Sequence, residues 1–118
     1  MPRCEVGDVV RVPFPYSDGT PRYRRPALVV SVIRPEDAPF LIWVLMITST
    51  RNRSWAGDLS ISDLAAAGLP AASVVRTAKI ATIEAARAER IGKLPSGVMA
   101  DVRATLDRRL SIVNRSSE

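Results

Sequence analysis

Two adjacent arginines, Arg24 and Arg25, stand directly before Pro26 and a run of small and branched apolar residues. Proline biases the residue before it toward an extended backbone, and it occupies the first position of a strand because it has no amide proton for the ladder. Residues 28–33 have the composition of a buried strand. We therefore expect Arg25 at the mouth of a core strand, with its guanidinium free to reach a ligand. A solvated arginine pair at a strand edge would give the same pattern.

The charge of the chain favours a polyanionic partner. It carries 17 basic and 12 acidic residues, a net charge of +5, and all of its basic residues except Lys79 and Lys93 are arginine. Guanidinium groups bind phosphate through a planar, bidentate fork. A basic surface of this kind is typical of proteins that bind nucleic acid. Solubility or a GC-rich genome could explain part of the arginine bias.

The sequence contains no histidine and only one cysteine, Cys4. The lack of histidine excludes Ser-His-Asp and Cys-His catalysis, removes the usual general base near neutral pH, and removes nearly every zinc site. A single cysteine excludes an intrachain disulfide and fits a reducing cytoplasm. The adjacent acids Glu36 and Asp37 lie in a polar turn, where we expect them to be solvated. We therefore expect no metal and no cofactor.

The pattern of apolar residues and turn residues predicts one domain over residues 1–118. The expected strands span residues 9–14, 25–33, 40–49, 58–61, 73–83 and 90–94, with short helical turns at 64–67 and 85–89 and an amphipathic helix over 98–113. The longest apolar run is far shorter than the roughly 20 residues that cross a bilayer, and no signal peptide is evident. We expect a cytoplasmic protein.

These elements predict a mainly β (α+β) fold, a strongly bent antiparallel sheet or partly open barrel closed by the C-terminal helix. The short turn after residue 33 predicts a hairpin, and the hairpin brings Arg25 near Thr48 and Ser49. Trp43 is expected in the core, in the middle of its strand. Residues 73–83 alternate regularly, which predicts Val75 and Ala81 on the same face.

Several ordered motifs resemble those of the MazF/PemK (CcdB-like) family of bacterial toxins. They are residues 7–10 (Gly-Asp-Val-Val), 12–15 (Val-Pro-Phe-Pro), 24–31, 47–49 (Ile-Thr-Ser), 73–83 and 90–94. The resemblance covers residues 6–110. It implies an SH3-like barrel, a homodimer, and a metal-independent endoribonuclease that cleaves single-stranded RNA at short sequences. It also implies a cognate antitoxin, whose acidic tail would occupy the basic groove.

The same resemblance implies the catalytic residues. The arginine of the family's Arg-Pro motif maps onto Arg25, and the threonine at the end of its third strand maps onto Thr48. Some members carry a carboxylate between the first two strands, where this chain has Asp18. In the later Ser-Val-Val strand, members of this family frequently carry Gln or Asp where this chain has Lys79.

RNA supplies its own nucleophile for such a reaction, the 2′-hydroxyl. Attack on the neighbouring phosphate would leave a 2′,3′-cyclic phosphate and a 5′-hydroxyl, and DNA would not be cut. Arg25 would stabilise the charge that develops on the phosphate oxygens, Thr48 would donate a hydrogen bond to one of them, and Asp18 is a possible base.

Two loops and their flanks offer the basic and aromatic groups that bind single-stranded RNA. The candidate RNA-binding residues are Ser17, Thr20, Arg22, Tyr23, Arg24, Ser49, Arg51, Arg53, Trp55 and Lys79. Trp55 could equally pack in the core or in a dimer interface, and Lys79 could be solvated. Two other functions stay open, a CcdB-like toxin that inhibits DNA gyrase without cutting RNA and a catalytically silent nucleic-acid-binding barrel.

Overall fold

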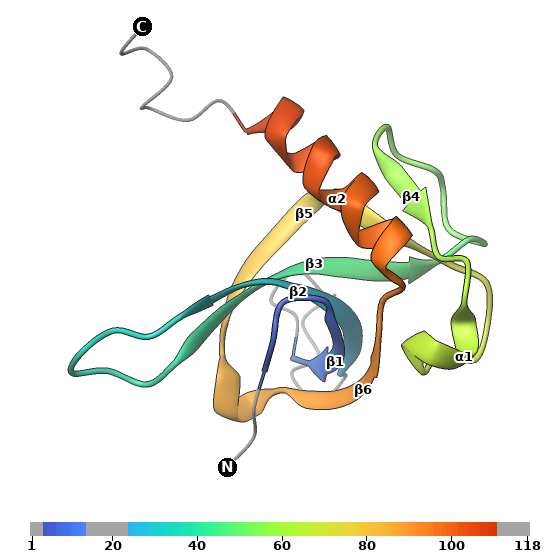
Figure 1. Ribbon diagram of the computed structural model, residues 1–118. Helices are drawn as coiled ribbons and strands as arrows, with labels where there is room; N and C mark the ends of the chain where they lie inside the picture. Colours follow the sequence, from blue (N-terminus) through green and yellow to red (C-terminus); the bar gives the residue numbers. More distant parts are fainter. Residues whose placement is uncertain (1–3, 14–23, 111–118) are drawn as a thin grey trace, which may run out of the picture.

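The computed structural model describes residues 4–13 and 24–110, which form a bent sheet crossed by a long helix (Figure 1). The strands are β1 (Asp8–Val12), β2 (Arg25–Ile33), β3 (Leu41–Ser49), β4 (Asp58–Ser60), β5 (Ser73–Glu84) and β6 (Glu89–Lys93). The helices are α1 (Leu64–Ala67), a short 3₁₀ turn (Ala85–Arg87) and α2 (Ser96–Arg109). All the expected elements are present, with ends that differ by a few residues at most sites.

The six strands pair antiparallel in the order β4-β5-β3-β2-β1-β6. The two outermost strands, β4 and β6, are neighbours of only one strand each, so the sheet bends without closing. The predicted class, a mainly β fold with a partly open antiparallel sheet and a C-terminal helix, is confirmed.

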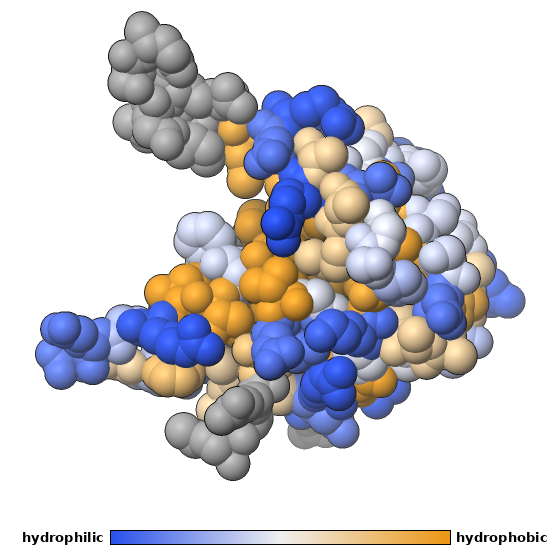
Figure 2. Space-filling model, viewed as in Figure 1, coloured by the Kyte–Doolittle hydropathy of each residue, from blue (hydrophilic) through white to orange (hydrophobic). Residues whose placement is uncertain are grey.

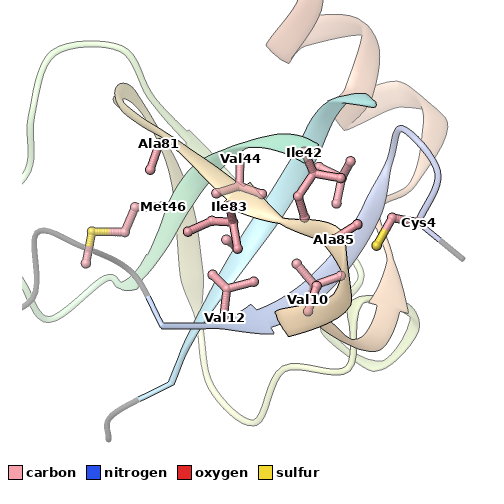
Figure 3. Close-up of a cluster of buried hydrophobic side chains, with 12 residues drawn as sticks. Cys4, Val10, Val12, Ile42, Val44, Met46, Ala81, Ile83 and Ala85 are labelled. Atoms are coloured by element: carbon pink, nitrogen blue, oxygen red, sulfur yellow. The ribbon is translucent and has the colours of Figure 1, made fainter. Parts of the chain in front are cut away.

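Side chains from opposite faces of the sheet form two separate apolar clusters. The first is enclosed by the bend of the sheet and includes Val10, Val12, Ala27, Val29, Ile42, Val44, Met46, Ala81 and Ile83 (Figure 3). The second lies between the sheet and α2 and includes Val9, Leu28, Leu45, Ile47, Val75, Leu94, Val98 and Val102. Strands β1, β2 and β3 therefore place side chains in both clusters, which explains their nearly continuous apolar sequences.

The regular alternation expected along residues 73–83 is wrong. Leu45 of β3 pairs with Ile80, but the next residue, Met46, pairs with Arg76, so β5 carries extra residues at this point. This bulge reverses the alternation, and it sends Val75 into the cluster under α2 while Ala81 enters the other cluster. Bulges of this kind redirect side chains on a strand.

The prediction that Trp43 is a core residue is also wrong, because its side chain is 46% exposed. Trp43 points to the face of the sheet that carries α2, as Leu45 does. The β2–β3 hairpin, however, extends well beyond the helix (Figure 1), and nothing among the described residues covers its outer part. Ile80, 37% exposed, lies on the same uncovered surface.

Candidate functional site

The register of the central strands brings Arg25 and Thr48 to the same end of the sheet. Ala27 pairs with Met46 across β2 and β3, and continuing this register by two residues sets Arg25 level with Thr48. Both residues share the alternation of Ala27 and Met46, whose side chains belong to the enclosed cluster. Met46 marks one end of that cluster (Figure 3), so the two polar side chains lie just beyond its apolar edge.

Thr48 is buried, and its hydroxyl is held by a residue that the sequence did not single out. The Asn52 side-chain amide donates a hydrogen bond to Thr48 Oγ1, with Nδ2 and Oγ1 2.5 Å apart. Thr48 itself is 8% exposed. Asn52 is brought close by a tight turn in which its backbone N–H donates to the Ser49 carbonyl oxygen at 3.1 Å. A polar residue four positions after Thr48 was the only sequence signal for this contact.

Arg25 combines partial exposure with an unpaired buried donor. Its Nε is buried and has no hydrogen-bond partner among the residues that the structure describes. Buried polar groups normally have partners, because an unpaired one retains its full desolvation cost. Arg24, by contrast, is exposed and donates to the main-chain carbonyl oxygen of Arg87.

The loop after β3 is anchored by a buried arginine, Arg76 of β5. Its Nε and Nη2 bind the two carboxylate oxygens of Asp58 at 3.2 and 2.9 Å, and Nη2 also donates to the Arg53 carbonyl oxygen at 2.6 Å. The guanidinium lies over the Trp55 ring, 4.3 Å from its centroid. Arg76 therefore ties both the main chain and the aromatic ring of this loop to the sheet.

Two opposing effects act on the Asp58 carboxyl. Burial raises its pKa. The side chain of Arg76 and the backbone N–H of Trp55 both donate hydrogen bonds to the carboxylate, and together with the positive charge of Arg76 they lower its pKa below the ordinary value. The carboxylate thus stays ionised beside Arg76. The two side chains are only 7% and 8% exposed.

The other predicted RNA-binding residues of this region surround the anchored loop. Arg51 and Arg53 are exposed, and Ser49 accepts a hydrogen bond on Oγ from the backbone N–H of Arg51 at 3.1 Å. Lys79 lies in the β5 bulge, with Nζ 5.5 Å from the centroid of the partly buried Trp55 ring. The structure therefore brings these basic groups to the side of the sheet where β3 ends.

The remaining predicted site residues lie outside the described residues. They are Ser17, Asp18, Thr20, Arg22 and Tyr23. Their strand neighbours are described, since Val12 at the end of β1 pairs with Arg25. The two strand ends that flank these residues in the sequence, Val12 of β1 and Arg25 of β2, are therefore paired with each other.

Nothing in the described part of the chain resembles a metal centre or a membrane span. No three His, Cys, Asp or Glu side chains are grouped there in a way that could hold a metal ion. No helix there is both long and apolar enough to span a bilayer. Burial, followed by the charge of Asp8, raises the pKa of the Cys4 thiol, so at neutral pH the group is a buried thiol rather than a thiolate nucleophile.

The chain is thus a small β protein with a bent antiparallel sheet, and a guanidinium and a hydroxyl lie level with each other at one end of that sheet. The chain belongs to the family of PemK-like, MazF-like toxins of type II toxin–antitoxin systems, whose family model matches residues 5–110. The predicted family is thereby confirmed. No curated protein matches the chain.

Solved structures of similar proteins share this fold over almost their whole length. The chain is similar to the MazE–MazF complex of Deinococcus radiodurans, with 25% identity, a TM-score of 0.64, and coverage of 92% of this chain and 96% of that one. It is similar to MazF alone from the same organism, with 24% identity, a TM-score of 0.67, and coverage of 92% and 97%. An endoribonuclease in complex with its cognate antitoxin from a mycobacterial species has 16% identity, a TM-score of 0.67, and coverage of 93% and 97%.

Proposed function

We propose that this toxin is an endoribonuclease that cleaves single-stranded RNA, with mRNA as the expected target, at short sequences and without a metal ion. One observation carries the proposal: the strand register, continued by two residues, sets the partly exposed Arg25 level with the buried Thr48. A fixed cation and a fixed hydroxyl donor are the groups that stabilise a phosphate as it gains charge.

The reaction that these groups support is an internal transfer within the RNA. The ribose 2′-oxygen attacks the adjacent phosphorus as its proton passes to a base, and the bond from phosphorus to the 5′-oxygen then breaks. The departing 5′-oxygen takes up a proton, so the products are a 2′,3′-cyclic phosphate and a 5′-hydroxyl. Arg25 stabilises the phosphate oxygens, Thr48 donates to one of them, and Asp18 is the proposed base.

The surroundings of the pair suit a flexible polyanion. Arg51 and Arg53 are exposed beside the end of β3, and Trp55 presents a partly exposed ring next to them. Basic groups interleaved with aromatic rings bind successive phosphates and bases of a single strand. Arg22, Tyr23, Arg24 and Lys79 complete the proposed RNA-binding surface.

Two protein partners are part of this proposal. The similar structures include toxins bound to MazE and to a cognate antitoxin. We infer that an antitoxin with an acidic segment occupies the same basic surface and so blocks Arg25. We also infer a homodimer that acts in the cytoplasm, where its RNA substrate is found.

RNA cleavage in the presence of a chelator tests the proposal. Purified protein is incubated in EDTA with a long single-stranded RNA of mixed sequence and with DNA of the same sequence. We expect the RNA to be cut at a few sites and the DNA to stay intact, because DNA lacks the 2′-hydroxyl. RNA that stays intact, or cleavage that requires magnesium, would contradict the proposal.

A further inference from the structure

The hydrogen bond between Asn52 and Thr48 fixes more than the position of the threonine. A hydroxyl has one proton to donate and two lone pairs that accept. Because Asn52 Nδ2 donates to Thr48 Oγ1, one lone pair is used and the hydroxyl proton is left to donate elsewhere. Among residues 4–13 and 24–110 no acceptor is found for that proton.

The direction of this bond matters for the proposed reaction. Thr48 can stabilise a phosphate oxygen only if its proton points away from the protein groups that surround it. A neighbour that accepted the hydroxyl proton would leave only lone pairs facing the phosphate. The amide nitrogen of Asn52 is a donor, so it leaves the proton available.

Asn52 is itself held in place from two sides. On one side, the backbone N–H of Asn52 donates to the Ser49 carbonyl oxygen. The backbone N–H of Thr50 donates to the Ala72 carbonyl oxygen, and both distances are 3.1 Å. On the other side, Arg76 binds the Arg53 carbonyl oxygen at 2.6 Å and is anchored to Asp58. The exposed loop therefore presents the Asn52 amide from a fixed main chain.

We propose that Asn52 is a positioning residue that sets the direction of the Thr48 hydroxyl, so that Thr48 donates a hydrogen bond to an oxygen of the scissile phosphate. This inference rests on the proposed function, because it assigns Asn52 a part in the same RNA-cleaving site. Asn52 contacts the Thr48 hydroxyl, and in this proposal it acts through Thr48.

Two substitutions separate the direction of the bond from its mere presence. Asn52→Ala removes the bond, and we expect kcat to fall about tenfold with KM changed less than twofold, the effect of losing one modest hydrogen bond. Asn52→Asp keeps the size and offers only acceptors at neutral pH, so it should capture the Thr48 proton and lower kcat by about 100-fold, one further tenfold step. Asn52→Asp with activity at or above that of Asn52→Ala would overturn the proposal.

A double-mutant cycle distinguishes a positioning role from a general one. Thr48→Val keeps the shape of the threonine and removes its hydroxyl. In this background Asn52→Ala should no longer change kcat, since the two residues act as one unit. An undiminished effect in the Thr48→Val background would overturn the proposal. Ser54→Ala, at an exposed position of the same loop, is the matched control and should leave kcat unchanged.

The hydrogen bond can also be observed without any reaction. In the folded full-length protein, NMR should show slower solvent exchange for the Asn52 side-chain amide protons in the wild type than in Thr48→Val. Equal exchange rates would overturn the proposal. If the wild type cut no RNA at all, the proposed function would fail, and the exchange comparison would still decide whether Asn52 donates to Thr48.

Discussion

Two arginines in neighbouring parts of one sheet have opposite environments, and this contrast separates scaffold from site. Arg76 is buried and contacts Asp58, the Arg53 carbonyl oxygen and the Trp55 ring. Arg25 is partly exposed, with a buried Nε that has no partner among the described residues. Protein groups hold the Arg76 guanidinium in place as part of the scaffold, whereas the partly exposed Arg25 is the guanidinium that we propose binds phosphate.

The ion pair of Asp58 and Arg76 predicts an acid-dependent loss of stability. Because the pKa of Asp58 is lowered in the folded protein, the pair stabilises the fold above the unfolded pKa of about 3.9. This stabilisation disappears as the pH falls through the lower, folded pKa. Asp58→Asn leaves Arg76 buried without its counter-ion, and we expect it to cost about 3–5 kcal/mol of unfolding free energy near pH 7.

Denaturant unfolding at several pH values checks this prediction. The difference in unfolding free energy between wild type and Asp58→Asn should be constant from pH 5 to 8 and shrink below about pH 4. Asp101→Asn, at an exposed position on α2, is the control and should stay close to the wild type throughout. A difference that does not change with pH would mean that the Asp58 charge is not what stabilises the fold.

At the scale of the elements, α1 packs against β6 so closely that only glycine fits. Gly68, which ends α1, has φ of +72°, and a Cβ there would lie 2.0 Å from the Ile91 carbonyl oxygen. Gly92 of β6 faces α1 in the same way, since a Cβ on it would lie 2.2 Å from the Ala67 carbonyl carbon. The contact therefore depends on two glycines, one on each element.

Gly68→Ala should destabilise the protein strongly for this reason. The new Cβ would overlap β6, and alanine is strained in the left-handed backbone conformation of this position. We expect the two effects together to lower the unfolding free energy by more than about 2 kcal/mol, seen as a lower Tm. Gly97→Ala is the matched control, because a Cβ at Gly97 meets nothing within 4 Å and a helical Gly→Ala change is neutral or stabilising. Equal Tm values for the two variants would contradict this account of the α1–β6 contact.

The elements could be predicted from the sequence, but their finer geometry could not. Pro26 fixed the start of β2, and Asp63 and Gly68 fixed the ends of α1, since each residue has a local backbone preference. The bulge in β5 depends on pairing with β3 and β4, which leaves no local signal in residues 73–83. The same long-range pairing hid the role of Arg76, whereas the contact of Asn52 with Thr48 is local and depends on a turn that its residue types do not specify. Trp43 was misassigned because its burial depends on how far α2 reaches.

At the scale of the whole molecule, an apolar surface is left uncovered. Figure 2 shows apolar residues gathered over the base of the β2–β3 hairpin, below the C-terminal end of α2. Trp43 and Ile80, with Ala81 and Thr82, line a cavity of about 320 Å³ on the sheet. Exposed aromatic and aliphatic patches of this kind mark interfaces between proteins. In a homodimer we expect this surface to be covered by the second copy.

Sedimentation velocity of wild type and Trp43→Arg tests the interface. We expect the wild type to be a dimer at micromolar concentration and Trp43→Arg to be a monomer, because a charge would be buried against the partner. Val6→Ser, which alters an apolar residue of similar exposure (41%) elsewhere on the surface, should remain dimeric. A monomeric wild type would contradict the dimer, and a dimeric Trp43→Arg would place its interface elsewhere.

The most direct test of the whole account compares the RNA ends made by wild type, Arg25→Ala and Arg34→Ala in EDTA. Arg34→Ala removes the same charge from an exposed turn at the far end of the β2–β3 hairpin, where Arg34 lies 5.4 Å from the Phe40 ring centroid. The account predicts 2′,3′-cyclic phosphate and 5′-hydroxyl ends for wild type and Arg34→Ala, and a loss of about 10³-fold in kcat for Arg25→Ala. Wild-type cleavage by Arg25→Ala, or products with 5′-phosphate ends, would contradict it.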